Sequence, residues 1–206
     1  MPKVGMGPIR RRQLIEATIA SISEYGMSAV TVSKIGKKAG VSPGIIHHYF
    51  GDKNSLIEAT MRSLLEDLRV AVVARLRQAK TPYQRAIAVI DGNFAPEQFD
   101  HPAVFGWLEL WAQSLHFPEL ARLRRANTRR LRSNLRHALR PLLPENEVEE
   151  AGFGLAAMID GLWLHSALTS GGLDFEKARQ TAHNYLDRLI SESLPMEDPS
   201  EKRKAG

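Results

Sequence analysis

Apolar residues recur every three or four positions along most of this chain, a period that predicts helices rather than strands. The run from Arg10 to Tyr25 places Leu14, Ile19 and Ile22 on one side, and Gly26 is expected to end that helix. The pattern predicts an all-α fold of roughly nine helices. The others are expected at about Val32–Ala39, Pro43–Phe50, Lys53–Ala79, Thr81–Phe94, Ala103–His116, Pro118–Arg140, Glu147–Thr169 and Phe175–Leu194.

Two of the predicted helices are short and closely spaced, at Val32–Ala39 and Pro43–Phe50. Thr31 can cap the first helix, and Gly40 stands where a left-handed residue would end it. Ser42 is expected to cap the second helix, with Pro43 at its first position. Two short helices joined by such a turn form a helix-turn-helix, which places its second helix in the major groove of DNA.

Positive charge is concentrated in the same part of the chain. The net charge is +5, and residues 1–60 carry eight Lys or Arg against four acids. A basic end on a nearly neutral body favours an anionic polymer as partner, here double-stranded DNA. The residues expected at DNA are Lys3, Arg10, Arg11, Arg12, Thr31, Lys34, Ser42, Pro43, Gly44, His47, His48, Tyr49 and Lys53.

These residues differ in the part of DNA that they are expected to contact. Lys3, the three arginines and Lys53 are expected to hold phosphates. Ser42, Gly44, His47 and His48 are expected nearest the base edges, while Ile46 and Phe50 are expected to be buried beneath them.

The domain organisation follows from the long helix that begins at Lys53. Residues 1–52 are predicted to form the DNA-binding domain with an N-terminal arm through residue 9, residues 53–194 a ligand-binding and dimerisation domain, and residues 195–206 a disordered tail. The Lys53–Ala79 helix, about 40 Å long, would be the lever between the two domains. Ala151–Leu168 is apolar or small on nearly every side, so we expect it to form a homodimer interface with the last helix.

A stripe of arginines on the Pro118–Arg140 helix allows two interpretations. It could be a second nucleic-acid surface, or a solvated face balanced by Glu145, Glu147, Glu149 and Glu150, and the second is favoured. The stripe consists of Arg122, Arg125, Arg129, Arg132, Arg136 and Arg140.

Three tryptophans and one carboxylate suggest a ligand site. Trp107 and Trp111 are four residues apart, and Asp160 and Trp163 are three apart, so each pair shares a helix face. Indole rings with a buried carboxylate suit a quaternary ammonium ion, which has no N–H to donate. Further walls are expected from Asn93, Phe94, Phe105 and His165. The competing interpretation is that these tryptophans are ordinary core residues.

Several function classes are disfavoured by what the sequence lacks. It has no cysteine, no signal peptide pattern and no uncharged apolar run near the length of a membrane span, so a cytoplasmic location is expected. No metal-ligand spacing, nucleophile motif or phosphate loop is present, and adjacent His47 and His48 point apart on a helix. An enzyme, a metal site or a cofactor is therefore not expected.

The helix-turn-helix region resembles the tetracycline-repressor (TetR) family of regulators. The matching residues are Thr31-Val32, Ile35, Ala39-Gly40-Val41-Ser42, Gly44, Tyr49-Phe50, Lys53 and Leu56. Two positions depart from the family pattern: Gly36 stands where Ala is common, and His47 where a phosphate-binding Tyr is common. The resemblance implies a homodimer that reads a pseudo-palindromic operator and answers to a small molecule.

Within that family, nearly the whole chain is similar to the choline-responsive repressors of glycine betaine synthesis. The resemblance implies repression of choline uptake and oxidation genes, relieved by choline or a close relative. Alternatives are a regulator of the same fold that answers another cationic or lipophilic ligand, an enzyme using His47, His101 or Asp160, and an architectural DNA-binding protein. The matching blocks are MPKVGM, Ile9–Ile15, Gly44-Ile45-Ile46 with His48–Phe50, Glu58–Arg62, Gly92-Asn93-Phe94, Trp107-Leu108 with Trp111, Ser133-Asn134-Leu135 and Ala151–Leu164.

Overall fold

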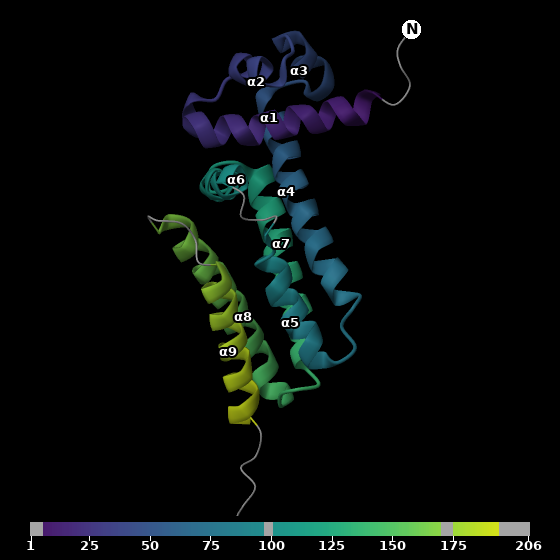
Figure 1. The fold of residues 1–206 in the computed structure, drawn as a ribbon, viewed down its shortest axis with the longest axis vertical. Coiled ribbons are helices and arrows are strands. Elements are labelled where there is room, and N and C mark those ends of the chain that lie inside the picture. The colour runs from purple at the N-terminus through teal and green to yellow at the C-terminus, as the bar shows by residue number, and fades with distance from the viewer. Residues whose placement is uncertain (1–5, 97–100, 170–174, 194–206) are drawn as a thin grey trace, which may run out of the picture.

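The structure is a computed structural model that describes residues 6–96, 101–169 and 175–193. These residues form nine helices and no strand, so the predicted all-α fold is confirmed (Figure 1). The helices are α1 (Met6–Ala29), α2 (Val32–Ala39), α3 (Pro43–Phe50), α4 (Lys53–Leu76), α5 (Pro82–Asn93), α6 (His101–Gln113), α7 (Pro118–Leu139), α8 (Glu145–Leu168) and α9 (Phe175–Ser193).

The head of the molecule consists of α1, α2, α3 and the start of α4 (Figure 1). Local capping sets its boundaries: the Thr31 hydroxyl accepts a hydrogen bond from the Lys34 N–H at 3.2 Å, and the Asp52 carboxylate accepts one from the Ser55 N–H at 2.7 Å. Gly40 ends α2 with φ 66°, as its position predicted. Ser42 precedes α3 in the capping position, but its side chain makes no capping hydrogen bond.

The first helix is longer than the sequence pattern predicted. It begins at Met6, inside the segment expected to be an arm, and continues past the expected end at Gly26 to Ala29. Gly26 does interrupt the helix, because its φ of 71° is outside the helical range and produces a kink.

One apolar core holds the head helices together. Leu14 of α1, Ile35 of α2, Ile46 of α3 and Leu56 of α4 are completely buried, and each contributes about 1.5–3 kcal/mol relative to an exposed position. Phe50, expected to be buried with Ile46, is only half-buried.

The unusual Gly36 has a packing reason. A Cβ atom at this position would lie 2.8 Å from the Val41 carbonyl oxygen, so a side chain would push against the turn backbone.

The body is formed by the remaining helices, with α4 running into it from the head (Figure 1). Helix α5 packs closely along α4, and a Cβ at Gly92 would come within 2.5 Å of Val72 Cγ2. Helix α6 lies beneath the head and packs against α1. Helices α8 and α9 pack against each other, and α8 also packs on α7. Because α6 packs against α1, this helix of the body is in direct contact with the head.

Helix α8 buries one face and leaves another apolar face uncovered. Leu155 and Ile159 are buried, whereas Phe153 is 56% exposed, Leu164 39% and Leu168 67%. By length and composition, α8 is also the one helix in the described part of the chain that is long and apolar enough to cross a bilayer. Asp160 interrupts this apolar stretch, so the expectation that no uncharged apolar run approaches this length is not contradicted. Helix α8 packs on α7 and α9, as a helix of a folded domain does.

The arginine stripe of α7 is partly balanced by acids at the start of α8. Arg132 and Arg136 both pair with Glu149, at 2.7 and 2.6 Å, and Arg140 pairs with Glu145 at 3.0 Å. Such exposed pairs contribute about 0–1 kcal/mol each. This pairing favours the solvated-face interpretation for the part of the stripe nearest the α7–α8 turn.

Candidate functional site

Helix α3 presents a continuous exposed surface at the tip of the head. Ser42, Pro43, Gly44, His47 and His48 are all exposed. The His47 Nδ1 atom lies 2.7 Å from the Gly51 carbonyl oxygen, which fixes the direction of its ring. Residues expected to face a partner are thus brought together on one accessible face.

Two more side chains on α3 complete this face. Tyr49 is half-buried, and its ring meets the His48 ring edge-on with centroids 5.1 Å apart. Ile45 is 37% exposed between the polar positions, although the sequence analysis did not assign it a role. An exposed aliphatic side chain on a recognition helix can contact the methyl group of thymine.

The arginines of α1 are held by partners within the head. The Arg11 guanidinium stands 5.0 Å from the centroid of the Phe50 ring and 5.9 Å from that of Tyr49, so it joins α1 to α3. Arg10 donates to Gln13 at 2.9 Å, and Arg12 donates to Glu16 at 3.0 Å. Their expected phosphate contacts stay a prediction, and for Arg11 the structure adds a role in positioning α3.

The lysines of α2 are also anchored to α1. Lys34 Nζ donates to the Ala29 carbonyl oxygen at 2.8 Å and lies 4.5 Å from the centroid of the Tyr25 ring. Lys38 pairs with Glu24, and this hydrogen bond holds the pKa of the Glu24 carboxyl below its usual value. Among the expected contacts, Thr31 is used as a cap, Lys53 opens α4, and Lys3 lies outside the described residues.

The body brings most of the predicted ligand residues into one small pocket. Trp107 and Trp111 come from α6, and Asp160 and Trp163 from α8, with Asn93 contributed by the end of α5. The Trp111 and Trp163 rings touch, with centroids 5.1 Å apart and planes tilted by 55°. Leu68, Asn127 and Ile159 also line the pocket, and the sequence analysis missed them because local spacing does not show which helices face one another.

Three further residues expected at this site lie elsewhere. Phe94 is buried next to a separate cavity lined by Arg75 and Arg179. Phe105 and His165 are exposed and do not line the tryptophan pocket. Their aromatic character suggested pocket walls, but the rotation of α6 and α8 about their axes turns them away from it.

The pocket combines aromatic rings with one carboxylate. Burial of its carboxyl group raises the pKa of Asp160 to about 6, and the positive charge of Arg124 opposes this rise. Asp160 still reaches solvent in the single chain. It lies at the border of the pocket, where surrounding side chains displace much of the water.

The pocket is small in this conformation. Its free volume is about 30 Å³, far below the ~300–1,000 Å³ typical of small-molecule sites. A quaternary ammonium ion with three methyl groups needs several times that space. No group of three metal-ligating side chains is found within residues 6–96, 101–169 and 175–193.

Comparisons with known proteins agree with this arrangement of head and body. Residues 14–60 match the model of the bacterial regulatory proteins of the tetR family, and residues 82–191 match the C-terminal domain of BetI-type transcriptional repressors. The chain is 52% identical over 193 residues to the HTH-type transcriptional regulator BetI 2 of Chromohalobacter salexigens, covering 93% of each chain. It is 48% identical to the regulator BetI of Escherichia coli, covering 95% of this chain and 99% of that one.

Solved structures share the fold at lower identity. A TetR transcription regulator from Haloarcula marismortui aligns with a TM-score of 0.79 at 21% identity, over 88% of this chain and 98% of that one. A regulator from Saccharomonospora viridis, solved in complex with choline, aligns with a TM-score of 0.76 at 20% identity, over 86% and 95%. The chain is thus a transcriptional regulator rather than an enzyme, and it belongs to the TetR family, with a C-terminal domain of the BetI repressor type.

Proposed function

We propose that this chain is a dimeric, cytoplasmic repressor of choline uptake and glycine betaine synthesis genes, released by choline or a close relative. Its two recognition helices would read a pseudo-palindromic operator, with half-sites about one DNA turn (~34–36 Å) apart. Support comes from the near 50% identity to BetI regulators over almost the full chain. The neighbour solved with choline shows that a protein of this fold can hold that ligand.

The observation that carries the proposal is the convergence of Trp107, Trp111, Trp163 and Asp160 on one pocket. Indole faces attract a cation that cannot donate hydrogen bonds, and a deprotonated carboxylate balances its charge. Asn93 and Asn127 add amide groups that could bind the hydroxyl group of choline or the carbonyl of its aldehyde. Selectivity for choline or its aldehyde would come from the combination of indole rings, carboxylate and amide groups, and not from one residue type.

Because the pocket is small in this conformation, ligand binding requires α6 and α8 to move apart. Trp111 and Trp163 meet across this boundary, so their ring contact is the one that a bound ammonium ion would replace. The present conformation would therefore be the ligand-free one that binds DNA.

Helix α6 provides a short route from this pocket to the head. Its Glu109 Oε1 accepts a hydrogen bond from the Met27 N–H of α1 at 3.3 Å. Next to it, Gly106 lies against α1, and a Cβ there would be 3.7 Å from Ile19 Cγ2. A shift of α6 would therefore be transmitted to α1 as well as through the α4 lever. A tenfold loss of operator affinity requires about 1.4 kcal/mol of coupling.

The proposal can be tested by fluorescence anisotropy with the DNA upstream of the gene, titrated with choline. We expect the wild-type protein to bind this DNA and to lose affinity when choline is added. Asp160→Asn should bind DNA as well as wild type but lose the choline response. This substitution is preferable to Trp107→Ala, because truncating a buried tryptophan costs about 3–5 kcal/mol of stability.

A second ligand class is the main alternative. Parallel titrations with betaine aldehyde and with a hydrophobic drug would distinguish a choline-type effector from an effector of another class. A response to the drug with none to choline or betaine aldehyde would assign the pocket to a different effector. An absence of any binding to duplex DNA at low salt would reject the repressor function altogether.

A further inference from the structure

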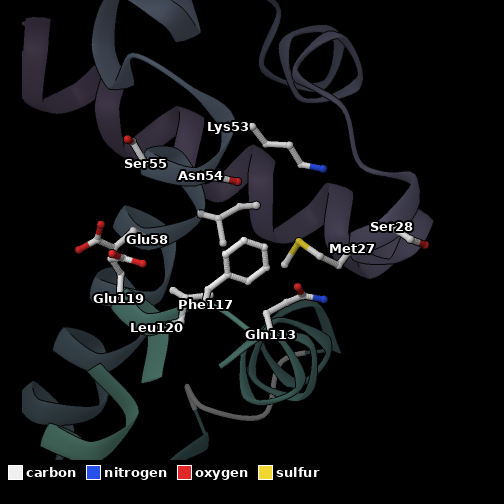
Figure 2. Close-up of a pocket in the computed structure, with 11 residues that line it drawn as sticks. Met27, Ser28, Lys53, Asn54, Ser55, Glu58, Gln113, Phe117, Glu119 and Leu120 are labelled. Carbon is white, nitrogen blue, oxygen red and sulfur yellow. The ribbon is translucent and has the colours of Figure 1, made fainter. Parts of the chain in front are cut away.

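A second and much larger cavity lies where the head meets the body. Its volume is about 480 Å³, within the ~300–1,000 Å³ typical of small-molecule sites. The end of α1, the first turns of α4 and the corner between α6 and α7 form its walls (Figure 2). It is separate from the tryptophan pocket, with which it shares no lining residue.

The centre of this cavity, which we call the joint cavity, is apolar and aromatic. Phe117 is 40% exposed although it is a large aromatic side chain, and its ring stands between Met27 and Leu120 in Figure 2. Met27 and Leu120 are themselves buried, at 6% and 4%. An aromatic ring held open to a cavity of this size leaves apolar surface that an organic molecule can cover.

The polar groups of the joint cavity are unevenly placed. Glu58 and Glu119 lie to the left of Phe117 in Figure 2, and Lys53 lies above Phe117 with its amino group to the right. Glu58 is already paired with Arg62 at 2.6 Å. Glu119 makes no ion pair within the described part of the chain. Its carboxylate is therefore the acidic group of the cavity lining that is available to a ligand.

We propose that the joint cavity is a second binding site, for an organic cation that combines a quaternary ammonium group with an apolar body. The ammonium group would lie between the Phe117 ring and the Glu119 carboxylate, where cation–π attraction and charge act together. The apolar body would cover Met27, Ile57 and Leu120. Lys53 disfavours a cation on the other side of the cavity, which sets the orientation of the ligand.

This site differs from the tryptophan pocket in the ligands that it admits. The joint cavity is large enough for an aryl or alkyl group that the much smaller tryptophan pocket would exclude. An occupant would touch Met27 and Lys53 of the head and Phe117 of the body together. Its binding would therefore depend on the angle between head and body, and operator DNA should change its affinity.

The test uses isothermal titration calorimetry of the full-length protein with benzyltrimethylammonium. Wild-type protein should bind it, and Glu119→Gln should weaken binding about fivefold, as expected for the loss of one solvent-accessible charge contact. Phe117→Leu, which keeps apolar volume but removes the ring, should also weaken it. Glu150→Gln removes an exposed acid outside the cavity and should leave binding unchanged, as should Asp160→Asn in the tryptophan pocket.

The outcomes separate this inference from the proposed function. Loss of binding in Asp160→Asn but not in Glu119→Gln would place the cation in the tryptophan pocket and overturn the joint site. No binding by wild-type protein would overturn it as well, whatever choline does to DNA affinity. A crystal grown with 4-bromobenzyltrimethylammonium gives a direct check: the bromine anomalous peak should lie beside Phe117, and a peak elsewhere would reject the assignment.

Discussion

Asp160 is the residue whose charge decides whether the tryptophan pocket can hold a cation. Burial raises the pKa of its carboxyl to about 6, so a sizeable fraction is protonated in mildly acidic solution. The neutral form keeps the shape of the pocket but offers no charge. The positive charge of a bound ammonium ion would in turn favour the deprotonated form.

Choline affinity should therefore depend on pH. A group with pKa about 6 is roughly ten per cent deprotonated at pH 5 and almost fully deprotonated at pH 7.5. We expect the Kd for choline, measured by calorimetry, to rise about tenfold between pH 7.5 and pH 5. Asp160→Asn should bind weakly at both values with little change between them. A pH dependence retained in that variant would show that another group titrates.

Lys53 is the first residue of α4, next to the Asp52 cap, and is predicted to contact a DNA phosphate. Lys53→Ala should weaken operator and random DNA equally and lower the slope of log K against log[salt] by about one unit. Lys80→Ala, which removes an exposed lysine between α4 and α5, is the matched control. A change in base preference without a change in slope would assign Lys53 to base reading instead.

Single residues that depend on near neighbours were predicted well from the sequence. Thr31 and Gly40 cap the two ends of α2 as predicted, because a cap involves only residues within about four positions. Ser42 occupies its predicted position, yet its hydroxyl forms no capping bond, and Arg11 is used to hold α3. The Arg11 contact depends on packing between helices, which a local pattern does not contain.

At the level of helices, α6 links the two proposed activities. One side presents Trp107 and Trp111 to the pocket, while Glu109 reaches Met27 of α1. Glu109→Ala should leave choline affinity nearly unchanged but reduce the effect of choline on operator binding, because the hydrogen bond to α1 is lost. Anisotropy titrations with and without choline measure both quantities. An unchanged response would mean that the signal travels through α4 alone.

The close packing of α5 on α4 is a second feature that can be tested. A methyl group at Gly92 would lie 2.5 Å from Val72 Cγ2 and 2.6 Å from Val72 Cα, so the helices would have to separate. We expect Gly92→Ala to cost about 1–3 kcal/mol of folding free energy in spite of its better helix propensity. Chemical denaturation followed by circular dichroism measures this loss. Gly7→Ala, with no atom within 4 Å, should be neutral or slightly stabilising.

The sequence predicted where the helices lie and which pairs of residues share a helix face. It did not predict which helices pack against one another. The spacing of Trp107 with Trp111, and of Asp160 with Trp163, correctly predicted that each pair shares a face. Leu68 of α4 and Asn127 of α7 also line this pocket, because their helices pack next to α6 and α8 there. The two pairs were brought together in the prediction by their residue types, because indole rings and a carboxylate suit a cation. Periodicity alone would not have combined them.

At the scale of the whole molecule, the uncovered face of α8 is the main feature that a single chain does not explain. Phe153, Leu164 and Leu168 are large apolar residues on this face, and all are exposed. TetR-family regulators act as dimers, so a second copy of α8 and α9 is the expected cover. A dimer is also needed to set two recognition helices one DNA turn apart.

Leu164→Glu should therefore convert the dimer to a monomer, because two carboxylates would meet near the two-fold axis in an apolar contact. Light scattering after size-exclusion chromatography measures the mass directly. Operator binding should fall together with the dimer, since one head covers only one half-site. Leu115→Glu supplies the matched control, because Leu115 is 76% exposed at the corner between α6 and α7, outside α8 and α9. A dimer that survives Leu164→Glu but not Leu115→Glu would move the interface to that corner.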